Sequence, residues 1–251
     1  MATATASGTP PSRSTFYVGM ASVFVLIAFV GFIPTYWAKM AGGTFGGNPI
    51  VHIHGMLFFA WTIYYFIQVR LVAVDRTIDH RTWGLLGVSL VTAMSIAIVL
   101  SAINAMKVGD LIGLGDQARH FAVVPLSSLA ILVPIFILAI ANTKRPETHK
   151  RLMILFMIPL MQAALARLFK TAFSPPGAVG SPPVIISVPP GILACALVIA
   201  AMVYDWRTRG RPHRVYVIGL VVLLAQVLIS VPLGASPQWM AFAKGLEGLA
   251  R

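Results

Sequence analysis

Long stretches without a charged side chain recur throughout this chain of 251 residues. A helix needs about 20 apolar residues to cross a bilayer, and any backbone inside the bilayer must satisfy its own hydrogen bonds. Hydrophobic residues make up 58% of the chain and charged residues only 10%, whereas soluble domains carry about 25% charged residues. The stretches are continuously apolar rather than alternating, which argues against a β-barrel. We therefore expect an all-α polytopic membrane bundle.

The apolar stretches predict seven transmembrane helices, and we expect spans two to five to form a four-helix core over residues 48–170. Asn48-Pro49 is a typical helix start, because Asn caps the first turn and proline fits the first helical position. Pro125 and Pro134 predict kinks in the fourth span. The predicted spans cover residues 16–37, 49–71, 80–106, 119–142, 149–169, 191–204 and 215–231.

The segments outside these spans differ in composition. Residues 1–15 are rich in Ala, Thr, Ser and Pro, so we expect them to be disordered. The membrane domain is expected over residues 16–235, and residues 236–251 read as a short amphipathic tail. The many prolines of residues 174–190 predict an irregular loop.

The formal net charge of +12 does not point to nucleic acid, because the basic residues lie in the short connections between spans. With the N-terminus placed in the cytoplasm, 12 basic residues fall on the cytoplasmic side and 7 on the other. Short loops with more Lys and Arg usually face the cytoplasm. We therefore expect a protein of the bacterial inner membrane with a cytoplasmic N-terminus and an external C-terminus.

Four histidines occur in a repeated pattern of histidine, apolar span, then histidine followed by basic residues. His54 and His80 form the first unit, and His120 and His149 form the second. Histidine is rare in apolar spans and is there a functional-site candidate, and imidazole is a common ligand of metals and haem iron. The predicted orientation places His54 with His120 at the outer face and His80 with His149 at the inner face.

Helical spacing indicates which faces point into the bundle. The positions one turn apart after His54 carry nearly all the polar capacity of that span, so we expect His54 to face inward and His52 to lie at the interface. His80 is followed on its own face by two glycines, which permit close approach of a helix or a flat ring. His213 reads as an ordinary basic loop residue. The two stripes are Phe58, Trp61, Tyr65 and Gln68 for the second span, and Gly84, Gly87, Val91 and Met94 for the third.

Paired histidines on alternate helices of a four-helix core resemble the cytochrome b561 family. The chain is also similar to a set of uncharacterised bacterial multi-span proteins that share three landmarks. Here these landmarks are His52-Ile53-His54-Gly55, His80-Arg81 and His149-Lys150-Arg151.

The resemblance implies that His54 with His120 and His80 with His149 ligate two haem b groups. It further implies transmembrane or quinol-linked electron transfer, with a quinone or a redox protein as partner. The chain departs from that family in one respect, because His80, His120 and His149 stand in the first turn of their predicted spans rather than a few turns inside. The candidate partners for haem propionates, by charge-assisted hydrogen bonds, are Arg81, Lys150, Arg151 and Arg167.

Two other hypotheses are open from the sequence. The histidines can cap helix starts or anchor the membrane interface, in a non-enzymatic subunit or assembly factor of a larger membrane complex. The outer histidines can instead bind a metal ion. The sequence contains no Walker loop, no dinucleotide-binding glycine fingerprint and no His-Glu-x-x-His motif. No carboxylate lies mid-span, which argues against a proton pump with an acidic relay.

Overall fold

The computed structural model describes residues 13–173 and 179–249, and within them the chain forms helices and no strands. Seven helical stretches are long and apolar enough to cross a membrane, which confirms the predicted seven-span bundle. Most of the predicted disordered segment, residues 1–12, lies outside the described residues. The α-helices are α1 (Arg13–Gly31), α2 (Ala38–Ala41), α3 (Pro49–Ala73), α4 (Thr77–Leu111), α5 (Gly115–Phe121), α6 (Val123–Ala141), α7 (Pro146–Phe173), α8 (Val188–Arg209), α9 (Arg214–Gly234) and α10 (Pro237–Gly248).

The sixth span begins earlier than predicted. A 3₁₀ turn, η2 (Val184–Ser187), leads directly into α8, so the prediction of an irregular loop up to residue 190 is wrong from residue 184 onward. Pro189 and Pro190 stand in the first turn of α8, where backbone N–H groups have no partner within the helix and proline therefore costs little. Residues 174–178 of the predicted loop lie outside the described part.

Prolines interrupt two spans. The fourth span consists of α5 and α6, which meet at Ala122, and the ring of Pro125 would clash with the carbonyl of Phe121 in one continuous helix. The first span passes from α1 through a π-helical turn, η1 (Ile33–Trp37), which contains Pro34. Pro134, in contrast, lies inside α6 without ending it.

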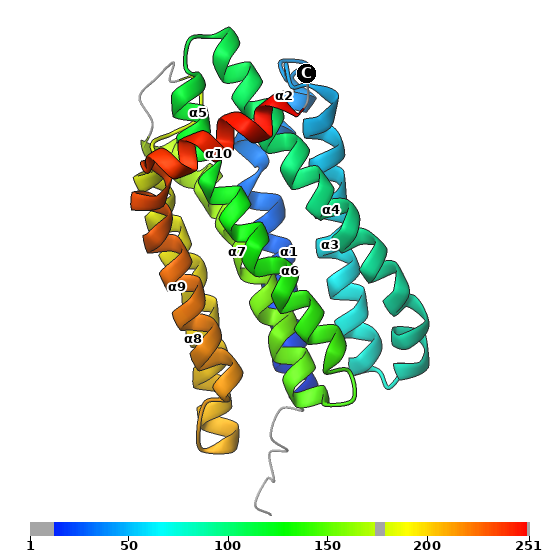
Figure 1. Ribbon diagram of the computed structural model, residues 1–251. Helices are drawn as coiled ribbons and strands as arrows, with labels where there is room; N and C mark the ends of the chain where they lie inside the picture. The colour runs from blue at the N-terminus through cyan, green and yellow to red at the C-terminus, as the bar shows by residue number, and fades with distance from the viewer. Residues whose placement is uncertain (1–12, 174–178, 250–251) are drawn as a thin grey trace, which may run out of the picture.

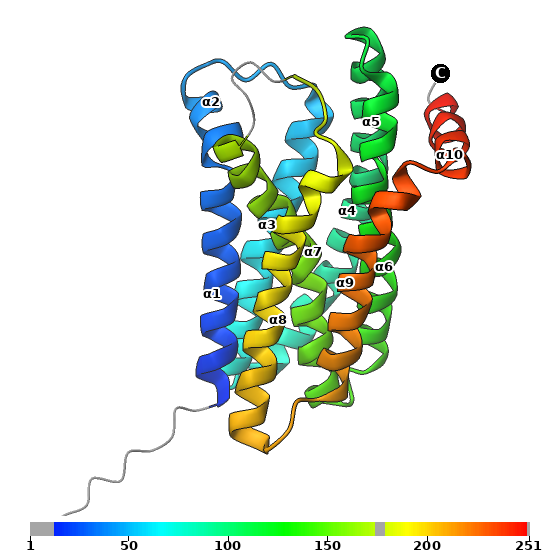
Figure 2. The same ribbon diagram turned by 90° about the vertical axis from the view of Figure 1, so that its left-hand side faces the viewer.

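Helix α7 is the central element of the bundle. Figures 1 and 2 show it between the α3–α4 pair and the α8–α9 pair, and it packs against α1, α6, α8 and α9. It is the most buried of the seven spans. The hydrophobic core therefore extends beyond spans two to five.

The predicted inward faces of α3 and α4 are confirmed by burial. Trp61, Tyr65 and Gln68 of α3 are buried, as are Val91 and Met94 of α4. These residues join the main core with side chains of α7; for example, the Trp61 indole N–H points to the sulfur of Met157 at 3.3 Å. The rotation of both helices thus follows their polar and small-residue stripes.

One end of the bundle carries α10, and we call it the α10 end. Figure 1 shows α10 crossing in front of α5 near this end, and it packs against α4, α5 and α9. The Trp239 indole N–H donates to the carbonyl of Arg119 at 2.8 Å, and the Arg119 side chain pairs with Glu247 and with Asp110. The opposite end, the α8–α9 end, holds the short connections between α3 and α4, α6 and α7, and α8 and α9.

Helices α1 and α7 approach each other closely at Gly31. A Cβ atom on this residue would lie 2.6 Å from the carbonyl oxygen of Ala164 in α7. Small residues allow such backbone approach in membrane helices. Gly19, also in α1, has no neighbouring atom within 4 Å of the corresponding position.

We expect Gly31→Ala to lower the free energy of unfolding by about 1–3 kcal/mol, because the backbone of Ala164 cannot move aside as a side chain would. Gly19→Ala is the control and should leave stability unchanged or slightly higher, because Ala favours a helix by about 0.5–1 kcal/mol over Gly. Unfolding of both variants in detergent measures this difference. Equal stability of the two variants would contradict the close contact.

Candidate functional site

His80 and His149 lie close together at the α8–α9 end. His80 stands in the first turn of α4 and His149 in the first turn of α7. Both helices begin at this end, so the two rings enter the bundle at the same depth. Their ring centroids are 6.2 Å apart and their planes are nearly perpendicular, at 80°.

The His149 ring is oriented by a hydrogen bond. Its Nδ1 lies 2.8 Å from the carbonyl oxygen of Ala139 in α6. A carbonyl oxygen can only accept, so Nδ1 carries the proton and donates. In neutral imidazole this leaves the lone pair on Nε2, the form that binds a metal.

The surroundings of His80 contain polar atoms without partners and open space. Nδ1 of His80 is buried without a hydrogen-bond partner, as are both side-chain polar atoms of Gln68 in α3. A Cβ atom on Gly84, one turn after His80, would meet nothing within 4 Å. At Gly87 it would lie 2.8 Å from the Tyr64 hydroxyl oxygen. Helix α3 therefore closes on α4 at Gly87 and leaves space at Gly84.

The structure places His54 and His120 in different surroundings. The His54 ring stacks on Phe58 at a centroid distance of 4.3 Å, and its Nδ1 is buried without a partner. His120 lies near the end of α5, and its carbonyl oxygen faces Gly234 of α9. Among the described residues, no ring contact joins His54 to His120. The structure therefore brings together the rings of His80 and His149 but not those of His54 and His120.

The four basic residues predicted to contact haem propionates also lie in different surroundings. Arg81, beside His80, is exposed and forms no ion pair within the described ranges. Arg167 lies near the α10 end of α7, with its guanidinium 5.5 Å from the ring centroid of Phe32. Lys150 pairs with Glu147 at 2.6 Å. Arg151 is fully buried in a network of ion pairs.

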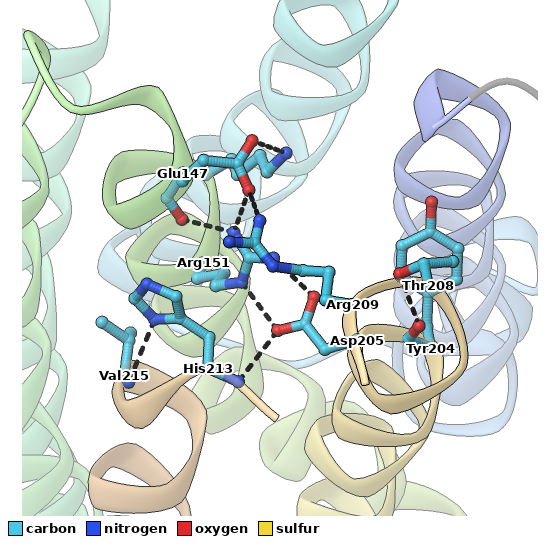
Figure 3. A network of polar contacts seen from close by, with 9 residues as sticks. Glu147, Arg151, Tyr204, Asp205, Thr208, Arg209, His213 and Val215 are labelled. Carbon is cyan, nitrogen blue, oxygen red and sulfur yellow. Dashed lines mark hydrogen bonds and ion pairs between the residues drawn. The ribbon is translucent and has the colours of Figure 1, made fainter. Parts of the chain in front are cut away.

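This network joins α7 to α8 (Figure 3). Arg151 is 1% exposed and Asp205 is 0% exposed, and two guanidinium nitrogens of Arg151 donate to the two Asp205 oxygens at 2.8 and 2.5 Å. A third nitrogen donates to Glu147 at 2.8 Å. Arg209 also pairs with Glu147. We call Glu147, Lys150, Arg151, Asp205 and Arg209 the carboxylate network.

His213 is part of the same region and is not an ordinary loop residue, which corrects the prediction from sequence. Its backbone N–H donates to Asp205 at 3.1 Å, and its Nδ1 accepts from the Val215 N–H at 3.3 Å, so the ring caps α9. The signal that was available is Asp205, because an acidic residue directly at the end of an apolar span requires a partner if it is buried. Burial, together with the nearby charge of Arg151, lowers the pKa of His213.

The buried pair makes a stability prediction. Asp205→Ala should lower the free energy of unfolding by about 3–5 kcal/mol, because it leaves the Arg151 charge in a dry interior with only Glu147. The double variant Arg151→Met with Asp205→Leu should recover most of this loss, since it removes both charges. Arg209→Ala is the control, and its half-exposed ion pair should contribute at most about 1 kcal/mol. A double variant as unstable as Asp205→Ala would refute the explanation.

The His213 cap makes a pH prediction. The pKa of His213 is lower in the folded protein than its ordinary value of 6.5, so the unfolded chain takes up this proton first as the pH falls. Stability should therefore decrease as the pH drops from above 6.5 through the folded pKa. His213→Asn keeps an N-cap without a titrating group, and its unfolding midpoint should fall less between pH 8 and pH 5.5. Parallel pH profiles for the two proteins would count against this role.

No family model, curated protein or solved structure matches the chain.

Proposed function

We propose that this membrane protein binds one haem b between His80 and His149 and transfers electrons. The observation that carries the proposal is the spacing of the two rings. Imidazole nitrogens bind a metal at about 2 Å, so two imidazoles on opposite sides of one metal atom have ring centres roughly 6 Å apart. The observed centroid distance is 6.2 Å.

The donor set favours haem over a bare metal ion. A structural zinc site uses four protein ligands and a catalytic one uses three. The described residues contain no group of three or more His, Cys, Asp or Glu side chains able to hold a metal ion. Haem requires only axial ligands from the protein, because its own ring supplies the other donors. Two histidines therefore suffice for haem and fall short for zinc.

The hydrogen bond of His149 supports the same assignment. Histidines that ligate a metal usually donate their second ring N–H to a carbonyl or carboxylate, which fixes the ring and raises its basicity. The bond from Nδ1 to the Ala139 carbonyl has this form. His149 is thereby held with its free nitrogen available before any ligand binds.

The residues around the pair fit a flat, partly polar group. Gly84 leaves open space beside His80, and the unpartnered amide of Gln68 offers a hydrogen bond to a bound molecule. Arg81 is available to a propionate because no carboxylate holds it within the described part of the chain. Lys150 and Arg151 are already paired with carboxylates, so Arg81 is the cation that would contact a propionate.

Haem bound here would supply one-electron redox chemistry. His80 and His149 would hold the group, and the apolar side chains around them would exclude water from it. The distribution of basic residues favours a cytoplasmic position for this end, in a bacterial inner membrane with the N-terminus inside. A quinol in the bilayer or a redox protein at the surface would then be the electron partner.

Absorption spectra of the protein purified from haem-sufficient cells test this proposal. We expect one haem per chain and a reducible spectrum of two axial imidazoles. His80→Ala and His149→Ala should each abolish that spectrum. His52→Ala is the matched control, because that ring contacts the Tyr36 hydroxyl at 3.0 Å and belongs to neither predicted pair.

A colourless preparation, or an unchanged spectrum in His80→Ala and His149→Ala, would overturn the proposal. The variants His54→Ala and His120→Ala extend the test to the second haem that the family resemblance implies. Retention of all haem in both would limit the protein to one site. Loss of half the haem would establish the second.

A further inference from the structure

A hollow opens at the α8–α9 end beside the carboxylate network. It has a volume of about 460 Å³ and is lined by Glu147, Thr208, Arg209 and Arg211. Three of these residues, Glu147, Arg209 and Thr208, are drawn in Figure 3 together with the ion pairs of Arg151. The connection between α8 and α9 that forms part of its wall projects beyond the other helix ends in Figures 1 and 2.

The charge of this hollow is positive. Its two nearby carboxylates are already neutralised: Glu147 accepts from Lys150, Arg151 and Arg209, and Asp205 accepts from Arg151. Arg211 adds a further cation and forms no ion pair within the described ranges. The region therefore holds four cations and two carboxylates, with a net formal charge of +2. The cations are Lys150, Arg151, Arg209 and Arg211, and the carboxylates are Glu147 and Asp205. An anion entering the hollow meets a net attraction and a guanidinium with free donors.

The residues beside the hollow are of the kinds found at the depth of the lipid headgroups. Trp206, one turn before Arg209 in α8, is 64% exposed, and exposed tryptophans concentrate at the membrane interface. Arg207 and Arg214 flank the same connection. This combination of an exposed indole and several arginines is typical of the boundary between the apolar layer and water.

An apolar strip leads from the hollow into the bilayer. Trp206, Val203 and Ile199 follow one another at helical spacing on one face of α8, and each of them is exposed. A molecule held by its phosphate at Arg211 would therefore find an apolar surface for acyl chains along α8. A free phosphate ion has no acyl chains and would contact only the charged side chains of the hollow.

We propose that this hollow binds the phosphate group of an anionic phospholipid, with Arg211 and Arg209 as the donors and the Ile199–Trp206 strip against its acyl chains. Guanidinium groups bind phosphate oxygens in a bidentate manner. Basic pockets between membrane helices are suited to such headgroups. The site is separate from the His80–His149 pair and does not depend on haem binding.

The test uses the full-length protein in detergent, freed of copurified lipid. Phosphatidylglycerol, phosphatidylcholine and inorganic phosphate are added separately, and thermal stability and bound lipid by native mass spectrometry are measured. We expect phosphatidylglycerol to raise the melting temperature and to remain bound, whereas the other two have little effect. Arg211→Ala should lose most of that binding, and the double variant Arg209→Ala with Arg211→Ala should lose all of it.

Arg145→Ala is the matched control, because Arg145 is an exposed arginine at the same end that does not line the hollow. The melting temperature of Arg211→Ala without lipid should equal that of the unmodified protein, which shows that its fold is intact. Equal lipid binding in the Arg211→Ala and Arg145→Ala variants would overturn the site. Equal stabilisation by inorganic phosphate would overturn the lipid as its occupant.

Discussion

The bidentate pair of Arg151 and Asp205 sets the rotation of the central helix. Both side chains are buried, so neither can leave its partner without placing a bare charge in a dry interior. Residues two positions apart on a helix point about 200° away from each other. Because Arg151 is held toward α8, His149 must face the other way, toward α4 and His80. The ion pair on one side of α7 thus positions the imidazole on the other.

The spans were predictable because apolar length is a property of the sequence itself. Their ends were less so, since proline is unfavourable inside a helix and harmless in its first turn. Pro189 and Pro190 therefore looked like part of a loop, although they begin α8. The same ambiguity appears at Pro134, which α6 includes without interruption. Only the packing around each proline determines which of its two effects applies.

The candidate site was predictable to a similar extent. His80 and His149 follow tight connections at one end, so topology alone brings them to the same depth. His54 and His120 also share an end, but α5 packs there against α4 and α10, which sequence spacing does not reveal. The pairing of Arg151 with Asp205 joins residues 54 positions apart and depends on the rotation of both α7 and α8. Residues at helical spacing indicate which face of a helix points into the bundle. They do not indicate which neighbouring helix that face contacts.

The ion pair between Arg119 and Glu247 has a consequence for assembly. The two residues are 128 positions apart, so during synthesis the first half of the fourth span enters the membrane long before its carboxylate partner exists. Until then, Arg119 has only the local acids Asp110 and Asp116. Helix α5 gains this contact only when α10 has been made. Helix α10, which is made last, therefore completes the contacts that hold α5 in the bundle.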